Sequence, residues 1–174
     1  MTDLKLWNSE VHITKNHNCY DYAMDHLDPG QKRKSQPGMR AGMPNPGKDE
    51  FTCAAITKRL KADHPEHDMS FHAEMNSFTC PSGTKKSALF VDPLKDYHFY
   101  REEESFNNCK QKIWSHKPGE KMVQHYDGSW NFISDPSKAD RHSNPFHYTH
   151  NCGFFCMPSL GNKTFSDMAY TPEK

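Results

Sequence analysis

The chain of 174 residues carries 22 basic and 22 acidic side chains, so its formal net charge is zero, and it also contains 12 histidines. This length suits one domain, the balanced charge gives no global field that attracts nucleic acid or an anionic membrane surface, and no apolar run approaches the roughly 20 residues of a membrane-spanning helix. Leu, Ile, Val and Phe supply only 25 residues, so we expect a compact, loop-rich domain with an aromatic and sulfur-rich core.

The first half of the chain predicts helices separated by loops. Residues 1–15 alternate weakly between apolar and polar side chains, which favours an edge strand. A helix is expected from Cys19 to Leu27, because Asn18 is a good N-cap and Asp28-Pro29-Gly30 stops the pattern. Its apolar face consists of Tyr20, Ala23, Met24 and Leu27.

A long loop is expected over residues 28–50, which contain four prolines and no periodicity. A second helix is expected over residues 51–62, followed by a polar, His-rich stretch at 63–86 with a short strand near 70–73.

The second half of the chain reads as strands. Asp127-Gly128 is a hairpin signal between two of them. Because helices precede an antiparallel sheet, the predicted fold class is α+β, in a single domain of residues 1–174 with its core at about 16–157 and a loose tail at 160–174. The expected strands are 88–91, 97–101, 112–116, 122–126, 129–133 and 152–157.

Three side chains are candidates for nucleophilic catalysis. Cys19 opens the first predicted helix, where the helix dipole and free amides lower a thiol pKa. His98 lies in the middle of a strand, on the face opposite Tyr97 and Phe99, and His116 ends the next strand. If the three converge, they form a thiolate, a base and an orienting group. Asn18 and Asn16 are candidates for binding an oxyanion.

Several segments also carry a resemblance. Asn-Cys-Tyr-Asp-Tyr-Ala (18–23), Asp-Tyr-His-Phe-Tyr-Arg (96–101), Trp-Ser-His-Lys-Pro-Gly (114–119), 139–141 and 152–156 resemble a set of small uncharacterised proteins of bacteria and large DNA viruses. The same layout is similar to the NlpC-type and CHAP-type branch of papain-like cysteine hydrolases. That resemblance implies a papain-like fold in which Cys19 is the nucleophile, His98 the base and His116 the orienting residue.

The main functional hypothesis is therefore a thiol hydrolase or transferase that acts on an amide bond in a peptide or peptidoglycan-like substrate, without a cofactor. Trp114, Trp130 and Phe132 are candidates for a substrate groove, with a place in the core as their alternative. Arg101 is a candidate clamp for a substrate carboxylate, with pairing to nearby glutamates as its alternative.

Two other classes of protein stay open. One is a non-enzymatic structural or interaction protein, such as a virion component, on the same fold. The other is a zinc-stabilised binding domain, since His147, His150, Cys152 and Cys156 are ligand types that zinc prefers. The first residues lack the layout of a signal peptide, so the expected location is the cytoplasm or a virion, with reduced cysteines as the default. No nucleic-acid or membrane partner is expected, and the sequence leaves the oligomeric state undetermined.

Overall fold

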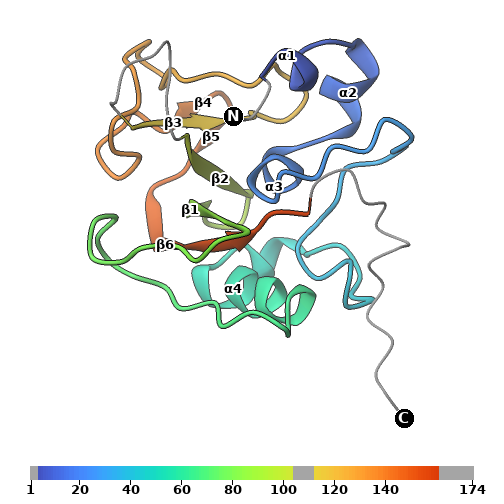
Figure 1. The fold of residues 1–174 in the computed structure, drawn as a ribbon, viewed down its shortest axis with the longest axis vertical. Helices are drawn as coiled ribbons and strands as arrows, with labels where there is room; N and C mark the ends of the chain where they lie inside the picture. The colour runs from blue at the N-terminus through green and yellow to red at the C-terminus, as the bar shows by residue number, and fades with distance from the viewer. Residues whose placement is uncertain (1–3, 104–111, 161–174) are drawn as a thin grey trace.

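A computed structural model describes residues 4–103 and 112–160, in which short helices pack against an antiparallel sheet (Figure 1). The main sheet has the strand order β3-β2-β1-β6, and a second sheet consists of β4 and β5. This arrangement confirms the predicted α+β class. The elements are α1 (Leu4–Trp7), α2 (Val11–Asn16), α3 (Cys19–Ala23), the 3₁₀ helix η1 (Lys48–Glu50), α4 (Cys53–Asp63), β1 (Thr84–Asp92), β2 (Asp96–Glu103), β3 (Ile113–His116), β4 (His142–Ser143), β5 (Phe146–His147) and β6 (His150–Pro158).

Side-chain caps determine where the two main helices begin. The Asn18 side chain accepts hydrogen bonds from the amides of Tyr20 and Asp21, and the Asp21 carboxylate accepts one in return from the Asn18 amide. This reciprocal pair satisfies amide groups that a helix N-terminus leaves open, and it confirms the predicted start at Cys19. The helix ends at Ala23 rather than at Leu27. Thr52 caps α4 through the Ala55 amide.

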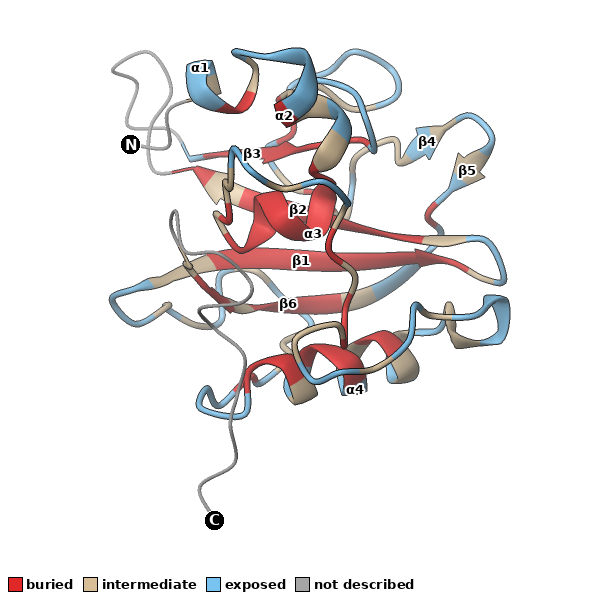
Figure 2. Cartoon of the chain, turned by 90° about the vertical axis from the view of Figure 1, so that its right-hand side faces the viewer, coloured by how far each residue is buried: buried red, intermediate tan, exposed pale blue. Residues whose placement is uncertain are grey.

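The sheet separates two apolar clusters because successive strand residues point to opposite faces. Both α3 and α4 cover one face, and loops cover the other, so β1, β2 and β6 are buried along most of their length (Figure 2). On the helix face lie Cys19, Tyr20, Met24, Ile56, Leu60, Leu89, Val91, Tyr97, Phe99, Phe155 and Met157; on the loop face lie Ala88, Phe90, Tyr100, Trp114, Ile133, Tyr148 and Phe154.

Three sequence-based expectations are wrong in detail. Residues 4–16 form helices α1 and α2 instead of an edge strand, because Trp7 is buried against Tyr22, with 5.1 Å between ring centroids. The predicted hairpin has only a single bridge, between Tyr126 and Phe132, since its loop is wider than two residues. Near residues 70–73 the structure has one bridge, from His72 to Phe154. The predicted tail falls mostly on residues 161–174, outside the described residues.

Two disulfides attach the surrounding segments to β6. Cys53, the first residue of α4, is bonded to Cys152, and Cys80, in the loop before β1, is bonded to Cys156. The partners are 99 and 76 residues apart in the chain. The expectation of reduced thiols is therefore wrong for these four cysteines. Within the described residues, no helix is long and apolar enough to cross a membrane.

Candidate functional site

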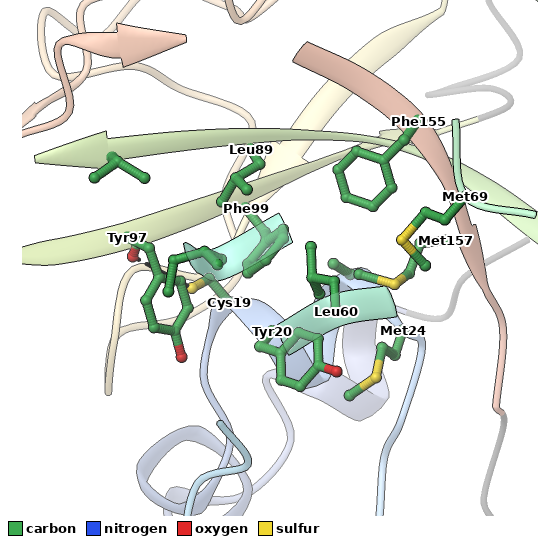
Figure 3. Close-up of a cluster of buried hydrophobic side chains, with 13 residues drawn as sticks. Cys19, Tyr20, Met24, Leu60, Met69, Leu89, Tyr97, Phe99, Phe155 and Met157 are labelled. Atoms are coloured by element: carbon green, nitrogen blue, oxygen red, sulfur yellow. Dashed lines mark hydrogen bonds between the residues drawn. The ribbon is translucent and has the colours of Figure 1, made fainter. Parts of the chain in front are cut away.

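Cys19, the predicted nucleophile, is part of the hydrophobic core. Its side chain lies beside Tyr97 and Phe99 on the helix face of the sheet, and the residue is only 5% exposed (Figure 3). The thiol Sγ lies 3.9 Å from the main-chain carbonyl oxygen of Tyr97, to which it donates a weak hydrogen bond. The helix that begins at Cys19 is five residues long and holds the thiol against the sheet.

The predicted base lies on the other side of the sheet. His98 follows Tyr97 in β2, and side chains alternate along a strand, so the imidazole points away from the face on which Cys19 packs. Its ring contacts Tyr100, His116 and Tyr148, all on the loop face. The structure thus brings His98 and His116 together but places Cys19 apart from both. The alternation was visible in the sequence, but the face that α3 covers was not.

The electrostatic environment of Cys19 also opposes nucleophilic reactivity. Burial raises the pKa of the Cys19 thiol far above its usual range, and the carboxylate of Asp96 raises it further. The expected lowering by a helix N-terminus does not occur, because desolvation penalises the thiolate more than one short helical turn stabilises it. The thiolate is the reactive form of cysteine, so the neutral thiol of Cys19 acts as a small apolar side chain.

We therefore expect Cys19 to resist alkylation in the folded protein. Iodoacetamide at pH 6 to 8, followed by peptide mass spectrometry, should leave Cys19 unmodified in the native state and should modify it fully after denaturation. Peptide mapping separates this thiol from Cys109, which lies outside the described residues. Rapid labelling of Cys19 in the native protein at pH 6 would contradict this assignment.

His98 and His116 form a buried, directional pair. His116 Nε2 lies 2.9 Å from the carbonyl oxygen of Tyr126, which only accepts, so Nε2 carries the proton. The unprotonated Nδ1 of neutral His116 then accepts a hydrogen bond of 2.7 Å from His98 Nε2. Burial lowers the pKa of His116 to about 4, and burial together with His116 holds the pKa of His98 well below its usual value. Both rings are therefore neutral at neutral pH.

Asn18, one of the two predicted oxyanion residues, has its side chain occupied within the fold. Asn18 Oδ1 caps α3, and its Nδ2 donates a 2.7 Å hydrogen bond to the carbonyl of Ser35. Every polar atom of this side chain is thus used within the fold. Asn16 ends α2, and its main-chain carbonyl accepts a hydrogen bond from the Gln31 side chain, so the oxyanion role of the Asn16 side chain stays a prediction.

Arg101 and Trp114, two of the predicted substrate-binding residues, are buried. Arg101 Nε and Nη2 lie 3.0 and 2.9 Å from Glu103 Oε1, while Nη1 bonds the Tyr22 carbonyl and the Asp25 carboxylate. The guanidinium also lies over the Tyr22 ring, 3.8 Å from its centroid. Arg101 is fully buried and Trp114 is 1% exposed. Arg101 therefore joins β2 to α3, and Trp114 belongs to the core on the loop face.

The alternative zinc site does not form. Two of its four proposed ligands, Cys152 and Cys156, are oxidised in disulfides with Cys53 and Cys80. A disulfide sulfur cannot supply the thiolate that zinc requires. Over residues 4–103 and 112–160, no group of three or more His, Cys, Asp or Glu side chains is placed to hold a metal ion.

Sequence reasoning missed the role of Lys117. Its ammonium donates hydrogen bonds to the carbonyls of Thr14, Gly119 and Lys121, at 2.6, 2.7 and 3.1 Å. Burial lowers its pKa to about 8. In the sequence, Lys117 stands directly before Pro118-Gly119, residues that end a strand, and nothing local indicated a buried ammonium.

The three main motif segments meet at one buried junction. Tyr22 belongs to the first segment, Arg101 to the second and Ser115 to the third. The Tyr22 and Ser115 hydroxyls are 2.7 Å apart, and both donate to Glu103 Oε1, which Arg101 also contacts. The motifs therefore have a structural explanation, since they supply the hydrogen bonds that connect α3, β2 and β3.

Comparisons with known proteins point away from hydrolysis. The chain is 30% identical over 139 residues to "Insoluble matrix shell protein 1" of Ruditapes philippinarum, a match that covers 78% of this chain and 77% of that protein. No family model matches the chain. No solved structure matches it either. The hypothesis of a papain-like thiol hydrolase is therefore wrong: the relative is a matrix protein.

Proposed function

The chain belongs to the family of insoluble matrix shell protein 1, and from that membership we propose that it is a non-enzymatic structural protein of an insoluble extracellular matrix. The observation that carries the proposal is the similarity to a matrix protein over most of both chains. Of the hypotheses that the sequence left open, the non-enzymatic structural protein is therefore the one we favour. The assembly that we propose for it is an extracellular matrix and not a virion.

The disulfides support an extracellular location. Disulfides form and persist in oxidising compartments, whereas cytosolic thiols are kept reduced. Two bonds that close loops of 99 and 76 residues suit a domain with few aliphatic side chains. Cross-links of this kind also suit a protein that must persist outside the cell without repair.

The arrangement of polar groups also favours a structural role. Arg101, Glu103 and Lys117 are buried and occupied by hydrogen bonds within the fold. Among the described cysteines, Cys19 alone is a free thiol, and it is buried. These groups stabilise the domain, and none of them supplies an activated nucleophile.

Fractionation of the extracellular material made by the source tissue tests the proposal. Mass spectrometry should find peptides of this chain in the insoluble material that remains after extraction with denaturant alone. Recovery of the chain only from the soluble intracellular fraction would contradict a matrix role. Antibodies to a cytosolic enzyme and to a soluble secreted protein provide the two fractionation controls.

A further inference from the structure

A cleft of about 530 Å³ opens on the loop face of the sheet. The His98–His116 pair lines its inner wall, and the loop of residues 127–131 supplies part of its rim through Trp130. Its volume falls within the roughly 300–1,000 Å³ that is typical of sites for small ligands. The cleft therefore has room for a short segment of a larger molecule.

Trp130 is displayed at this rim. The residue is 77% exposed and has a φ of 64°, a left-handed conformation that bulky side chains rarely adopt. The surrounding loop imposes this conformation: the Asp127 carboxylate accepts hydrogen bonds from the amides of Ser129, Asn131 and Asp140. Strain of this kind persists only where the surroundings determine it, and it is frequent at ligand sites.

Two further rings extend the exposed indole into an aromatic patch, which we define as Tyr126, Trp130 and Phe132. The centroid of the Tyr126 ring lies 6.2 Å from that of Trp130 and 4.6 Å from that of Phe132. Phe132 is 54% exposed. Adjacent exposed aromatic rings are an unusual feature of a monomer surface and mark a surface for interaction. The patch offers flat apolar faces beside a polar cleft.

The charged groups that line the cleft are of both signs, and most of them are held by hydrogen bonds or ion pairs within the protein. Glu120 pairs with Lys34, and Lys121 also lines the cleft. Arg141 donates hydrogen bonds to four main-chain carbonyls. Asp96 accepts from the Tyr97 amide and the Tyr148 hydroxyl, and Asp140 accepts from the Ser129 hydroxyl and the His142 amide. The histidine pair is neutral, as shown above. Because acidic and basic groups are interspersed, the lining selects strongly for neither an anion nor a cation. Its uncharged polar side chains, which include Gln124, Ser143 and Asn144, suit the hydroxyl groups of a neutral ligand.

We propose that this cleft and the aromatic patch bind a neutral polysaccharide chain, with one pyranose ring stacked on Trp130 and its neighbour hydrogen-bonded in the cleft. A pyranose with equatorial hydroxyls has flat faces of C–H groups that pack on an aromatic ring, and an edge of hydroxyls that needs polar partners. The patch and the cleft provide these two kinds of contact side by side. The proposal adds a ligand to the structural role.

Tryptophan fluorescence gives a direct test, because Trp7 and Trp114 are 2% and 1% exposed and Trp130 is the third Trp of the chain. Acrylamide should quench Trp130 preferentially, and a soluble hexamer of β-1,4-linked glucose or N-acetylglucosamine should protect it. By isothermal titration calorimetry, Trp130→Ala should bind the protecting hexamer about tenfold more weakly. Trp130→Tyr should retain binding within about threefold, since it keeps a ring.

Leu94→Ala is the matched control, because Leu94 is 59% exposed, also has a positive φ and does not line the cleft; its affinity should equal that of the wild type. The inference is overturned if neither hexamer protects Trp130 or if Trp130→Ala binds as the wild type does. It is also overturned if only a sulfated dextran or a gelatin peptide gives protection. Any of these results leaves the matrix role standing, since that role rests on the relative and the disulfides.

Discussion

Removing either disulfide is expected to lower the free energy of unfolding by about 4.5 kcal/mol, which is the loop-entropy value for closed loops of this length. The cross-linked residues are 99 and 76 positions apart. Small domains have total stabilities of about 5–15 kcal/mol, so each loss is a large share. The double variants Cys53→Ala/Cys152→Ala and Cys80→Ala/Cys156→Ala should melt at clearly lower temperatures, and a variant lacking both bonds should not fold.

Chemical denaturation of the oxidised protein and of the two double variants measures this effect. Cys19→Ala is the matched control, because it replaces a buried cysteine that makes no cross-link. Cys19→Ala should lower the free energy of unfolding much less than either pair of replacements, because it removes only the sulfur atom from the core. Equal stability of the oxidised and the fully reduced protein would contradict a structural role for the two bonds.

Mild acid should destabilise the protein strongly. Burial lowers the pKa of both His64 and His116 to about 4, and it also lowers the pKa of His98. In the unfolded chain these groups titrate near 6.5, so below that pH the unfolded state binds more protons than the folded state. The contribution of these neutral histidines to the free energy of unfolding is therefore fully present above about pH 6.5, and it is lost as the pH falls towards 4. Over this pH range, His64 and His116 should each lower the free energy of unfolding by about 3 kcal/mol.

Two buried carboxyl groups act in the opposite sense. Burial raises the pKa values of Asp63 and Asp96, so their protonation below neutral pH favours the folded state. The buried histidines are more numerous than these carboxyl groups, so the net effect of acid remains a loss of stability. Urea denaturation at unit steps from pH 7 to pH 4 measures it. The pH dependence should be weaker in His64→Gln, and it should match the wild type in His150→Gln, whose side chain is exposed. A free energy of unfolding that stays constant between pH 7 and pH 4 would refute the assignment of buried neutral histidines.

Local signals in the sequence were sufficient for the main elements. The Asn18 cap correctly predicted the start of α3, and aromatic alternation correctly predicted β2, which extends a residue or two beyond the expected ends. The predicted long loop after α3 is confirmed except for the short 3₁₀ helix at Lys48–Glu50. In each case the determining interactions lie within a few residues of one another, so the pattern is visible without the tertiary structure.

Contacts between segments that lie far apart in the chain could not be predicted from the sequence. Six cysteines allow many pairings, and the observed partners are 99 and 76 residues apart in the chain. Cys19 had the local features of a nucleophile, but α3 packs on the helix face while His98 points to the loop face. Residues 4–16 became helices because burial of Trp7 against Tyr22 outweighs weak local alternation. These outcomes depend on which surfaces meet.

We propose that this chain is a disulfide-stabilised structural protein outside the cell. Peptide mapping of the natural protein, extracted from the insoluble matrix under conditions that prevent thiol exchange, tests it most directly. The account predicts that Cys53 is linked to Cys152 and Cys80 to Cys156, with Cys19 recovered as a free thiol. Recovery of these four cysteines as reduced thiols, from protein found inside cells, would contradict it.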